Sequence, residues 1–273
     1  MVSADYTVDE LMSVCIARCI QNYDVAAQGM ATPLVVAGYL LAKLTHAPDL
    51  RFASAIGQGI CQDWAPLGLA RAEELWLDKA LKTTGFITIA ADLLPRLHPM
   101  EFLRPAQIDA HGNSNNVAIG KNYQHPRMRL PGTGGIPDVS VVYSHMHLYV
   151  PRHSRAVFVP QVDFVSGLGY SPQRKNGHGP VYLVSNLGVF DWHAGRMRLV
   201  SYHPGVSCDR IQVKTGFELL VAADVCETVP PTTEELRLLR EEIDPLGLRK
   251  LETLGGTARR NLLREILAQE DVL

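Results

Sequence analysis

Short apolar segments bounded by glycine, proline and asparagine fill the middle of this 273-residue sequence, and helical patterns lie on both sides of them. VYLVSN at 181–186 and MRLVSYH at 197–203 have the length and the β-branched content of strands. DVSVVYS at 138–144, GFITIA at 85–90 and AVFVPQVDFV at 156–165 predict strands as well. Helical and strand patterns in this order predict an α/β fold in which helices flank an open mixed sheet.

The predicted helices begin at recognisable signals. Capping-box spacing, a threonine followed three residues later by glutamate, occurs at 7–10 and at 232–235. Thr32 is followed by Pro33, and proline is favoured at the first helical position. The segment 67–82 has acidic residues early and lysines late, which suits the helix dipole. RRNLLREILAQ predicts a last amphipathic helix.

The composition is that of an ordinary globular protein, with 47% apolar residues, 20% charged residues and a formal net charge of -2. No linker or internal repeat divides the sequence, so we expect one domain over residues 1–273 with a helical extension at about 232–273. The near-neutral charge argues against a nucleic-acid surface. The most apolar stretch, residues 33–42, is too short to span a bilayer.

The cysteines and the N-terminus bear on the compartment. MVSADYTVDE is acidic and polar, which argues against a secretory signal. Five cysteines, odd in number and scattered, favour reduced thiols, so we expect a cytoplasmic protein. Cys15 and Cys19 lie four residues apart on a predicted helix. Small buried side chains are favoured there over a shared metal, because no second pair of ligands has suitable spacing.

One stretch, RLPGTGGIPDVSVV at 129–142, concentrates glycine and proline just before a predicted strand. It lacks the Gly-Lys-Ser/Thr of a phosphate loop and the third glycine of a dinucleotide fingerprint. Two interpretations stay open at this point. The stretch is a structural turn, or its consecutive N–H groups form an oxyanion hole at the mouth of the strand.

Other groups of reactive side chains favour structural roles. His145 and His147 are predicted on one face of a strand, with His153 nearby, but no carboxylate completes a metal site, so satisfied or exposed histidines are favoured. Cys61 has no activating neighbour in the sequence, which favours burial over a role as nucleophile. No G-x-S-x-G elbow occurs in the sequence.

Two polar clusters are ambiguous in the same way. The acid–base pair in Asp191-Trp192-His193 is interpreted as part of a surface turn, since neighbours along a strand face opposite sides. The asparagines of GNSNN at 112–116 predict a hairpin turn, because asparagine tolerates left-handed backbone. The same amides would also be able to form a polar pocket wall that orients a carbonyl group.

Six stretches, taken in order, carry a resemblance to a known family. They are GNSNN at 112–116, LPGTGGIPD at 130–138, QVDFVSGLGY at 161–170, GPVYLVSNLGVFDW at 179–192, MRLVSYHPGVSCDRIQVKTGFEL at 197–219 and EELRLLREEIDPLGLR at 234–249. Over roughly residues 8–250 the sequence resembles the β subunit of family I coenzyme A transferases of the glutaconate CoA-transferase type. The resemblance implies an open α/β fold and a homologous α subunit as partner, usually in an α2β2 heterotetramer. It also implies an acyl-CoA substrate, with coenzyme A as part of that substrate, and no metal or permanently bound cofactor.

The resemblance also assigns catalytic positions. In that family the PGTGG-like stretch places backbone amides against the thioester carbonyl oxygen, which assigns Gly134 and Gly135 as the oxyanion hole. The family's β subunit also carries a glutamate that attacks the thioester. Ala53 falls at that position here, and no residue from 51 to 61 is a carboxylate. Alanine cannot form an enzyme-bound CoA ester, so protein-mediated transfer lacks its nucleophile.

This departure makes the sequence similar to one branch of the family, the two-subunit hydrolases of bacterial steroid breakdown. They open a ring of a cyclic keto acyl-CoA ester. Cleavage of a C–C bond by water requires carbonyl polarisation and a general base, and we expect the α subunit to supply a carboxylate as that base. Two alternatives stay open: a CoA-transferase β subunit that uses a glutamate from elsewhere, and a structural subunit without catalytic groups.

Four further residues are candidates for substrate binding on polarity and position. Ser54 and Gln58 are expected to line the space that the missing glutamate leaves. Asn113 and Asn116 are expected to orient substrate carbonyl groups.

Overall fold

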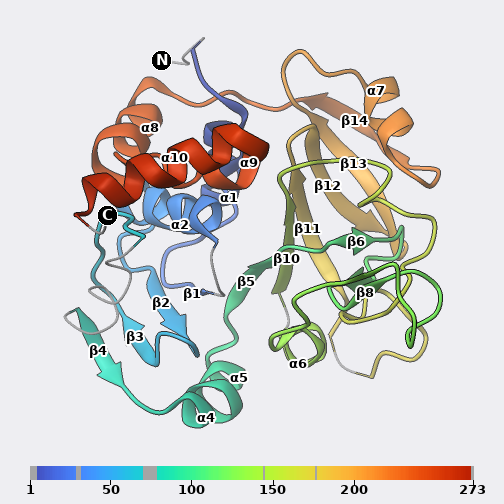
Figure 1. Ribbon diagram of the computed structural model, residues 1–273, viewed down its shortest axis with the longest axis horizontal. Helices are drawn as coiled ribbons and strands as arrows, with labels where there is room; N and C mark the ends of the chain where they lie inside the picture. Colours follow the sequence, from blue (N-terminus) through green and yellow to red (C-terminus); the bar gives the residue numbers. More distant parts are fainter. Residues whose placement is uncertain (1–4, 29–31, 70–78, 144, 176, 272–273) are drawn as a thin grey trace. The chain divides into compact units, whose positions relative to one another are not determined.

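The computed structural model describes residues 5–28, 32–69, 79–143, 145–175 and 177–271. Contacts group these residues into two compact units, both drawn in Figure 1. Unit 1 comprises the described residues of 1–99 and 230–273, and unit 2 comprises those of 100–229. The C-terminal helices therefore pack with the N-terminal third of the chain. The expected single domain with an extension at about 232–273 stays a prediction.

Unit 1 combines a small mixed sheet with helices. β1 (Val25–Ala27) pairs in parallel with β2 (Arg51–Ser54), and β3 (Gly59–Cys61) runs antiparallel to both β2 and β4 (Ala80–Thr83). The helical segments are α1 (Val8–Ala17), α2 (Pro33–Thr45), α4 (Phe86–Thr88), the π-helical η1 (Ile89–Leu93), α5 (Leu94–Leu97), α8 (Thr233–Arg237), the π-helical η2 (Leu238–Ile243), α9 (Lys250–Thr253) and α10 (Gly256–Gln269).

Helices α1 and α2 form the apolar centre of unit 1. The predicted capping box of α1 is present, and the Thr7 N–H donates to Glu10 Oε2 at 2.8 Å. Helix α2 begins at Pro33, as its sequence predicts. A Cβ on Gly38 would lie 2.6 Å from Ile16 Cγ2, so only glycine at this position allows α2 to approach α1 this closely.

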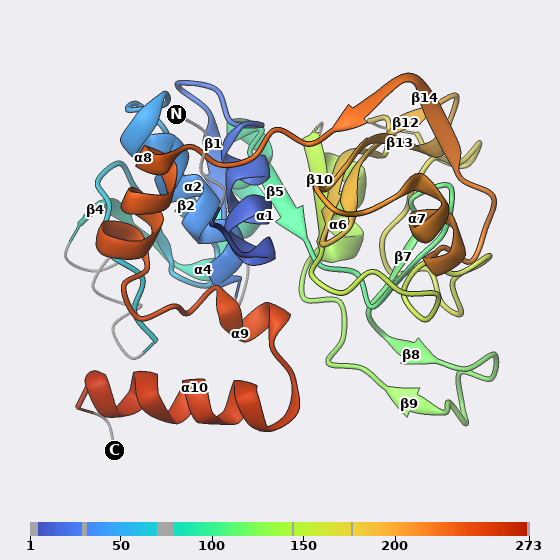
Figure 2. The same ribbon diagram turned by 90° about the horizontal axis from the view of Figure 1, so that it is seen from above.

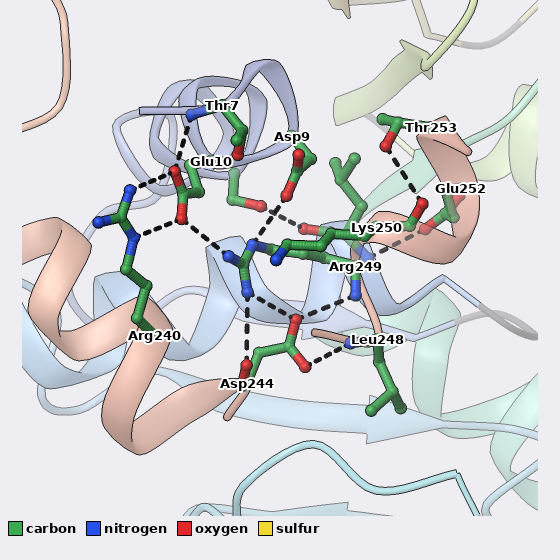
Figure 3. Close-up of polar contacts among 12 residues, drawn as sticks. Thr7, Asp9, Glu10, Arg240, Asp244, Leu248, Arg249, Lys250, Glu252 and Thr253 are labelled. Carbon is green, nitrogen blue, oxygen red and sulfur yellow. Dashed lines mark hydrogen bonds and ion pairs between the residues drawn. The ribbon is translucent and has the colours of Figure 1, made fainter. Parts of the chain in front are cut away.

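A buried ionic network joins α1 to the C-terminal helices of unit 1 (Figure 3). The Arg249 side chain is 2% exposed, and its guanidinium nitrogens lie 3.0 Å from Asp9 Oδ2, 2.9 Å from Glu10 Oε1 and 2.8 Å from Asp244 Oδ2. Arg240 also donates to both carboxylate oxygens of Glu10, at 2.7 and 2.9 Å. The pairing satisfies charges that would otherwise be costly to bury.

Unit 2 contains a mixed sheet in the order β14, β13, β12, β11, β10, β5 (Figure 1). Its strands are β5 (Met100–Leu103), β10 (His145–Val150), β11 (Pro180–Ser185), β12 (Gly188–His193), β13 (Arg196–Tyr202) and β14 (Leu220–Glu227). The pairs β5–β10, β10–β11 and β13–β14 are parallel, and β12 is antiparallel to both of its neighbours. The predicted α/β class with a mixed sheet and flanking helices is confirmed.

The core of unit 2 lies against this sheet. Leu148, Leu183, Phe190 and Leu199 from four neighbouring strands are fully buried there, together with Ile211 of α7 (Cys208–Lys214). Two small ribbons complete the unit: β6 (Gln107–Ile108) with β7 (Ser114–Asn115), and β8 (Ala118–Ile119) with β9 (Met128–Arg129). Figure 2 shows the β8–β9 hairpin extending from the rest of unit 2.

Three predicted strands are wrong. DVSVVYS belongs mostly to helix α6 (Ile136–Val142), because Pro137 presets the first turn and the Val139 N–H donates to the Gly135 carbonyl at 2.9 Å. GFITIA forms α4 and the start of η1. AVFVPQVDFV forms turns and bends with one isolated bridge, between Phe158 and Ile108. Phe86, Ile87 and Val165 of these segments are exposed, so apolar and β-branched content predicts neither a strand nor burial here.

The helix predicted at 67–82 falls largely on residues 70–78, which lie outside the described residues, and its end forms β4 instead. Helix α7 and strand β14 were not predicted. Among the helices that the structure describes, none is long and apolar enough to cross a lipid bilayer.

Candidate active site

The glycine-rich stretch forms a loop between β9 and α6 in unit 2. Gly132 and Gly134 have positive φ values of 108° and 54°, and Gly135 is the N-cap residue of α6. Within the part of the chain that the structure describes, the N–H groups of Gly134 and Gly135 donate to no acceptor. A Cβ at either position would meet no atom within 4 Å. The loop therefore presents open backbone donors, and it does so at the start of a helix, where the sequence pattern had predicted a strand.

The loop is anchored to the asparagine-rich segment. The Gly132 N–H donates to the Asn116 carbonyl at 3.1 Å, and the Leu130 N–H donates to the Val117 carbonyl at 3.0 Å. The Asn116 side chain accepts a hydrogen bond from the Ala106 N–H at 2.7 Å and donates to the Arg104 carbonyl at 3.0 Å. Asn116 thus joins the end of β5 to the glycine-rich loop.

The predicted hairpin is confirmed by the antiparallel pair β6–β7. Within it, Asn113 also makes hydrogen bonds that join loops. Its side-chain amide donates to Asp109 Oδ2 at 3.0 Å, and its Oδ1 accepts from the Gly169 N–H at 3.0 Å. Asp109 Oδ1 also accepts from the backbone N–H groups of Asn113 and His111. Both asparagines therefore brace loops of unit 2 through their side chains.

Ser54 and Gln58 lie close together in unit 1, at the turn between β2 and β3. The buried Ser54 hydroxyl donates to the Gln28 carbonyl at 3.1 Å and accepts from the Gly57 N–H at 2.9 Å. Gln58 is exposed and has a positive φ of 52°. Ala53 is fully buried in β2, where it pairs with Ala27 of β1 and Ile60 of β3.

Unit 2 contains an open pocket of about 500 Å³ beside the glycine-rich loop. Gly132 and Asn116 line it together with Arg104 and Arg152. The two arginines were not among the residues predicted from the sequence. The segment that ends at Arg104 has the sequence pattern of a broken helix, whereas the structure forms strand β5 directly before Arg104. Their signal is a position one or two residues after a short strand, as in MEFLR and HLYVPR.

The predicted structural roles of the other reactive side chains are confirmed for several residues. His153 is buried, with its ring nitrogens 3.0 Å from Ser185 Oγ and from Thr215 Oγ1. Burial lowers the pKa of His153 to about 3, so the ring is neutral. Cys15 and Cys61 are buried, and burial raises the pKa of the Cys61 thiol to about 11.

Asp191 lies in β12 rather than in a turn, and Arg198 of β13 pairs with it through two nitrogens at 2.9 and 2.6 Å. Both carboxylate oxygens of Asp191 are therefore engaged by Arg198, and Asp191 is the acid of the suggested acid–base pair. Among the described residues, no group of three or more histidine, cysteine, aspartate or glutamate side chains is placed to hold a metal ion.

One buried carboxyl group has no signal in the sequence. Glu101 of β5 is 9% exposed, and in the described chain no hydrogen bond reaches its side chain. Burial raises the pKa of Glu101 to about 7. Tyr143, at the end of α6, is also buried, and its phenol pKa is raised by burial and by the charge of Glu101.

Comparisons with known proteins place these features in context. Residues 88–214 match the family model described as coenzyme A transferase. The chain is 34% identical over 250 residues to the cholesterol ring-cleaving hydrolase IpdB subunit of Rhodococcus jostii, a match that covers 87% of this chain and 94% of that protein. It is 30% identical over 265 residues to one of the subunits of glutaconate CoA-transferase from Acidaminococcus fermentans, with 88% and 94% covered. The crystal structure of the decarboxylase AibA/AibB superposes with a TM-score of 0.78 at 31% identity, covering 90% of this chain and 98% of that one.

Proposed function

Because this chain belongs to the coenzyme A transferase family, we propose that it is the β subunit of a two-subunit hydrolase of steroid ring degradation. The reaction is cleavage of a C–C bond in a cyclic keto acyl-CoA ester by water. The similarity to a cholesterol ring-cleaving hydrolase subunit, which covers 94% of that relative, supports this assignment. The similarity to glutaconate CoA-transferase supports the family but leaves CoA transfer as the alternative reaction.

One observation favours the first of these reactions: Ala53 stands where the resemblance places the transferase glutamate. Ala53 is fully buried in β2, which pairs with β1 and β3, and residues 51–61 contain no carboxylate. Without a carboxylate this segment has no group that could carry coenzyme A as a covalent ester. Water must then attack the substrate directly.

The glycine-rich loop supplies the hydrogen-bond donors that the proposal requires. The N–H groups of Gly134 and Gly135 donate to no acceptor in the described chain, and Ile136 continues directly into helix α6. Paired backbone donors in fixed positions stabilise an oxyanion without reorganising during the reaction. In the proposal these two N–H groups bind the substrate oxygen on which negative charge develops.

The chemistry balances with one water molecule. A carboxylate of the α subunit takes a proton from water, and the hydroxide adds to the ring ketone carbon. The C–C bond next to that carbon breaks, and its electron pair leaves as an enolate whose oxygen the two glycine N–H groups hold. The α-subunit carboxyl group then returns its proton to the enolate carbon, and the ketone carbon with its added hydroxyl becomes a new carboxyl group, which completes the ring opening.

The remaining residues have supporting roles in this proposal. Ser54 and Gln58 line the space left by the missing glutamate, and Asn113 and Asn116 position substrate carbonyl groups, directly or through the loops that they brace. The active form is a cytoplasmic complex with a homologous α subunit, as an α2β2 heterotetramer. Coenzyme A enters only as part of the substrate.

The test is an assay of the chain co-expressed with its α partner. With a cyclic keto acyl-CoA, the product is expected to be heavier than the substrate by one water, and no CoA is expected to pass to added carboxylates. Transfer of CoA to a carboxylate without a water-added product would instead establish the transferase reaction. Equal activity of the folded complex and of the α subunit alone would instead establish a structural subunit.

Replacement of Ala53 provides a matched pair of variants. Ala53→Glu restores a carboxylate at the family's position, and Ala53→Gln adds the same bulk without a nucleophile. Both place a polar group at a fully buried position, so both are expected to lower the melting temperature. Only the glutamate variant is expected to acquire covalent CoA and slow CoA exchange. Unchanged ring cleavage by both variants would show that the substrate does not bind near Ala53.

A further inference from the structure

The pocket of unit 2 lies where open α/β sheets bind their ligands. Arg104 directly follows β5, and Arg152 lies two residues beyond the end of β10. Strands β5 and β10 are parallel neighbours with Leu103 opposite Leu148, so both arginines lie at the same edge of the sheet. Ligands of such sheets bind outside the carboxyl ends of the strands.

The lining combines apolar walls with cationic side chains. Val150 and Val157 contribute apolar surface, and Arg104 and Arg152 are exposed residues that line the same pocket. Guanidinium groups recognise carboxylates and phosphates through paired, charge-assisted hydrogen bonds. The volume of about 500 Å³ falls within the range of small-molecule sites. The lining thus suits a ligand with an apolar body and an anionic group.

The neighbouring sequence strengthens this preference for an anion. Residues 104–132, which contribute most of the pocket wall, include four arginine or lysine residues and a single carboxylate, Asp109. The Asp109 side chain is buried and binds the backbone of its own turn. The whole chain has a net charge of -2, so this segment is more positively charged than the chain on average. A local excess of positive charge attracts anionic substrates.

The pocket also lies close to the proposed oxyanion hole along the chain. Gly132 lines the pocket, and Gly134 follows two residues later, which limits the separation of their Cα atoms to roughly 7 Å. This separation is short enough for one molecule to reach both the pocket arginines and the N–H groups of Gly134 and Gly135.

We infer that Arg104 and Arg152 form a subsite for a second anionic group of the acyl-CoA substrate. This inference rests on the proposed function, because it takes the thioester to lie at Gly134. The shared chemistry is an oxyanion, with two sources in such a substrate: a free carboxylate on the acyl group, or a phosphate of coenzyme A.

Binding of unreactive thioethers to the α–β complex tests the subsite without requiring catalysis. The probes are S-(carboxypropyl)-coenzyme A, S-butyl-coenzyme A, which lacks the carboxylate, and S-(carboxypropyl)-pantetheine, which lacks the nucleotide. Affinities are measured by calorimetry for the parent complex and for Arg104→Gln and Arg152→Gln. Arg210→Gln is the matched control, because Arg210 is an exposed residue of unit 2 on α7 and does not line the pocket.

If the subsite holds the acyl carboxylate, each pocket variant weakens both carboxypropyl probes about tenfold or more and leaves S-butyl-coenzyme A unchanged. If it holds a phosphate, each variant weakens both coenzyme A probes and leaves the pantetheine probe unchanged. Affinities that match those of the Arg210→Gln control for all three probes would overturn the inference. Because the probes do not react, such a result would leave the ring-cleavage proposal standing. Conversely, if the probes bind as expected but no water-added product forms, the ring-cleavage proposal is contradicted and the anion subsite is not.

Discussion

The backbone N–H of Gly132 donates to the carbonyl oxygen of Asn116 at 3.1 Å. This hydrogen bond anchors the glycine-rich loop to the asparagine-rich segment. The Asn116 side chain in turn binds the Ala106 N–H and the Arg104 carbonyl. One residue therefore links the end of β5, the pocket and the loop that carries the proposed oxyanion donors.

Asn116→Ala is expected to loosen this junction. It removes one of the two acceptors of the Ala106 N–H, which also donates to the Asn115 carbonyl at 3.1 Å, and it removes the side-chain donor to the Arg104 carbonyl. Each lost hydrogen bond typically costs about 0.5–1.5 kcal/mol. Both the melting temperature and kcat/KM are expected to fall, and Asn122→Ala, at an exposed position, serves as the control. A fall in kcat/KM at an unchanged melting temperature would instead show that Asn116 acts by direct contact with the substrate.

Gly135→Phe tests the oxyanion donors. A side chain at this position has open space and the backbone φ is -142°, so the variant is expected to fold with the parent's melting temperature. The phenyl group would cover the neighbouring N–H groups, and loss of an oxyanion-hole donor costs about 100-fold or more in kcat. Gly85→Phe, where a side chain also meets open space, is the control. A parental kcat in a folded Gly135→Phe complex would contradict the assignment.

Arg249→Leu is expected to destabilise unit 1 strongly. It leaves the carboxylates of Asp9, Glu10 and Asp244 in a buried site without their shared cation (Figure 3). Breaking a buried ion pair in this way costs about 3–5 kcal/mol. Chemical denaturation monitored by circular dichroism measures the loss. Arg237→Leu removes an exposed arginine with several glutamate partners and is expected to change stability little, so equal effects of the two variants would refute the role of burial.

Glu101 is expected to make stability depend on pH between about 4.5 and 7. Its pKa is raised to about 7 by burial, so the folded state binds the proton more tightly than the unfolded chain does. The resulting stabilisation is complete below about pH 4.5 and is lost as the pH rises through 7, on the order of 3 kcal/mol in all.

Glu101→Gln removes this dependence. The variant is expected to be more stable than the parent at pH 8 and to show a flatter profile of melting temperature against pH. Glu218→Gln, at an exposed position, is expected to keep the parental profile. A Glu101→Gln profile that falls as steeply as that of the parent would show that Glu101 is not the titrating group.

The elements that sequence patterns predicted well are those whose signals are local. The capping boxes at Thr7 and Thr232 mark real helix starts, because both the threonine and the glutamate bind the backbone of the same turn. Strands β11 and β13 were predicted because one of their faces packs on the core. The edge strand β14 was missed, since most of its residues are not buried and it therefore lacks a strong apolar pattern.

The errors near the site have one physical cause: the amino-acid composition of a segment does not show which distant segment it contacts in the folded chain. The run DVSVVYS has strand-like composition, yet Pro137 at the start of the helix and the acceptor at Gly135 favour a short helix. The glycines of the loop were identifiable from sequence, since open backbone needs residues without side chains. Arg104 and Arg152 were not identifiable from sequence, because they line the same pocket only when β5 and β10 pair in parallel.

The central claim, attack by water without a protein nucleophile, is tested most directly by a single-turnover reaction in ¹⁸O-labelled water. The α–β complex is mixed with a cyclic keto acyl-CoA and quenched with acid, which preserves thioester adducts, and both product and polypeptides are weighed by mass spectrometry. The account predicts one ¹⁸O atom in the new carboxyl group and an unmodified mass for this chain. A CoA or acyl adduct on any side chain of this chain would contradict it.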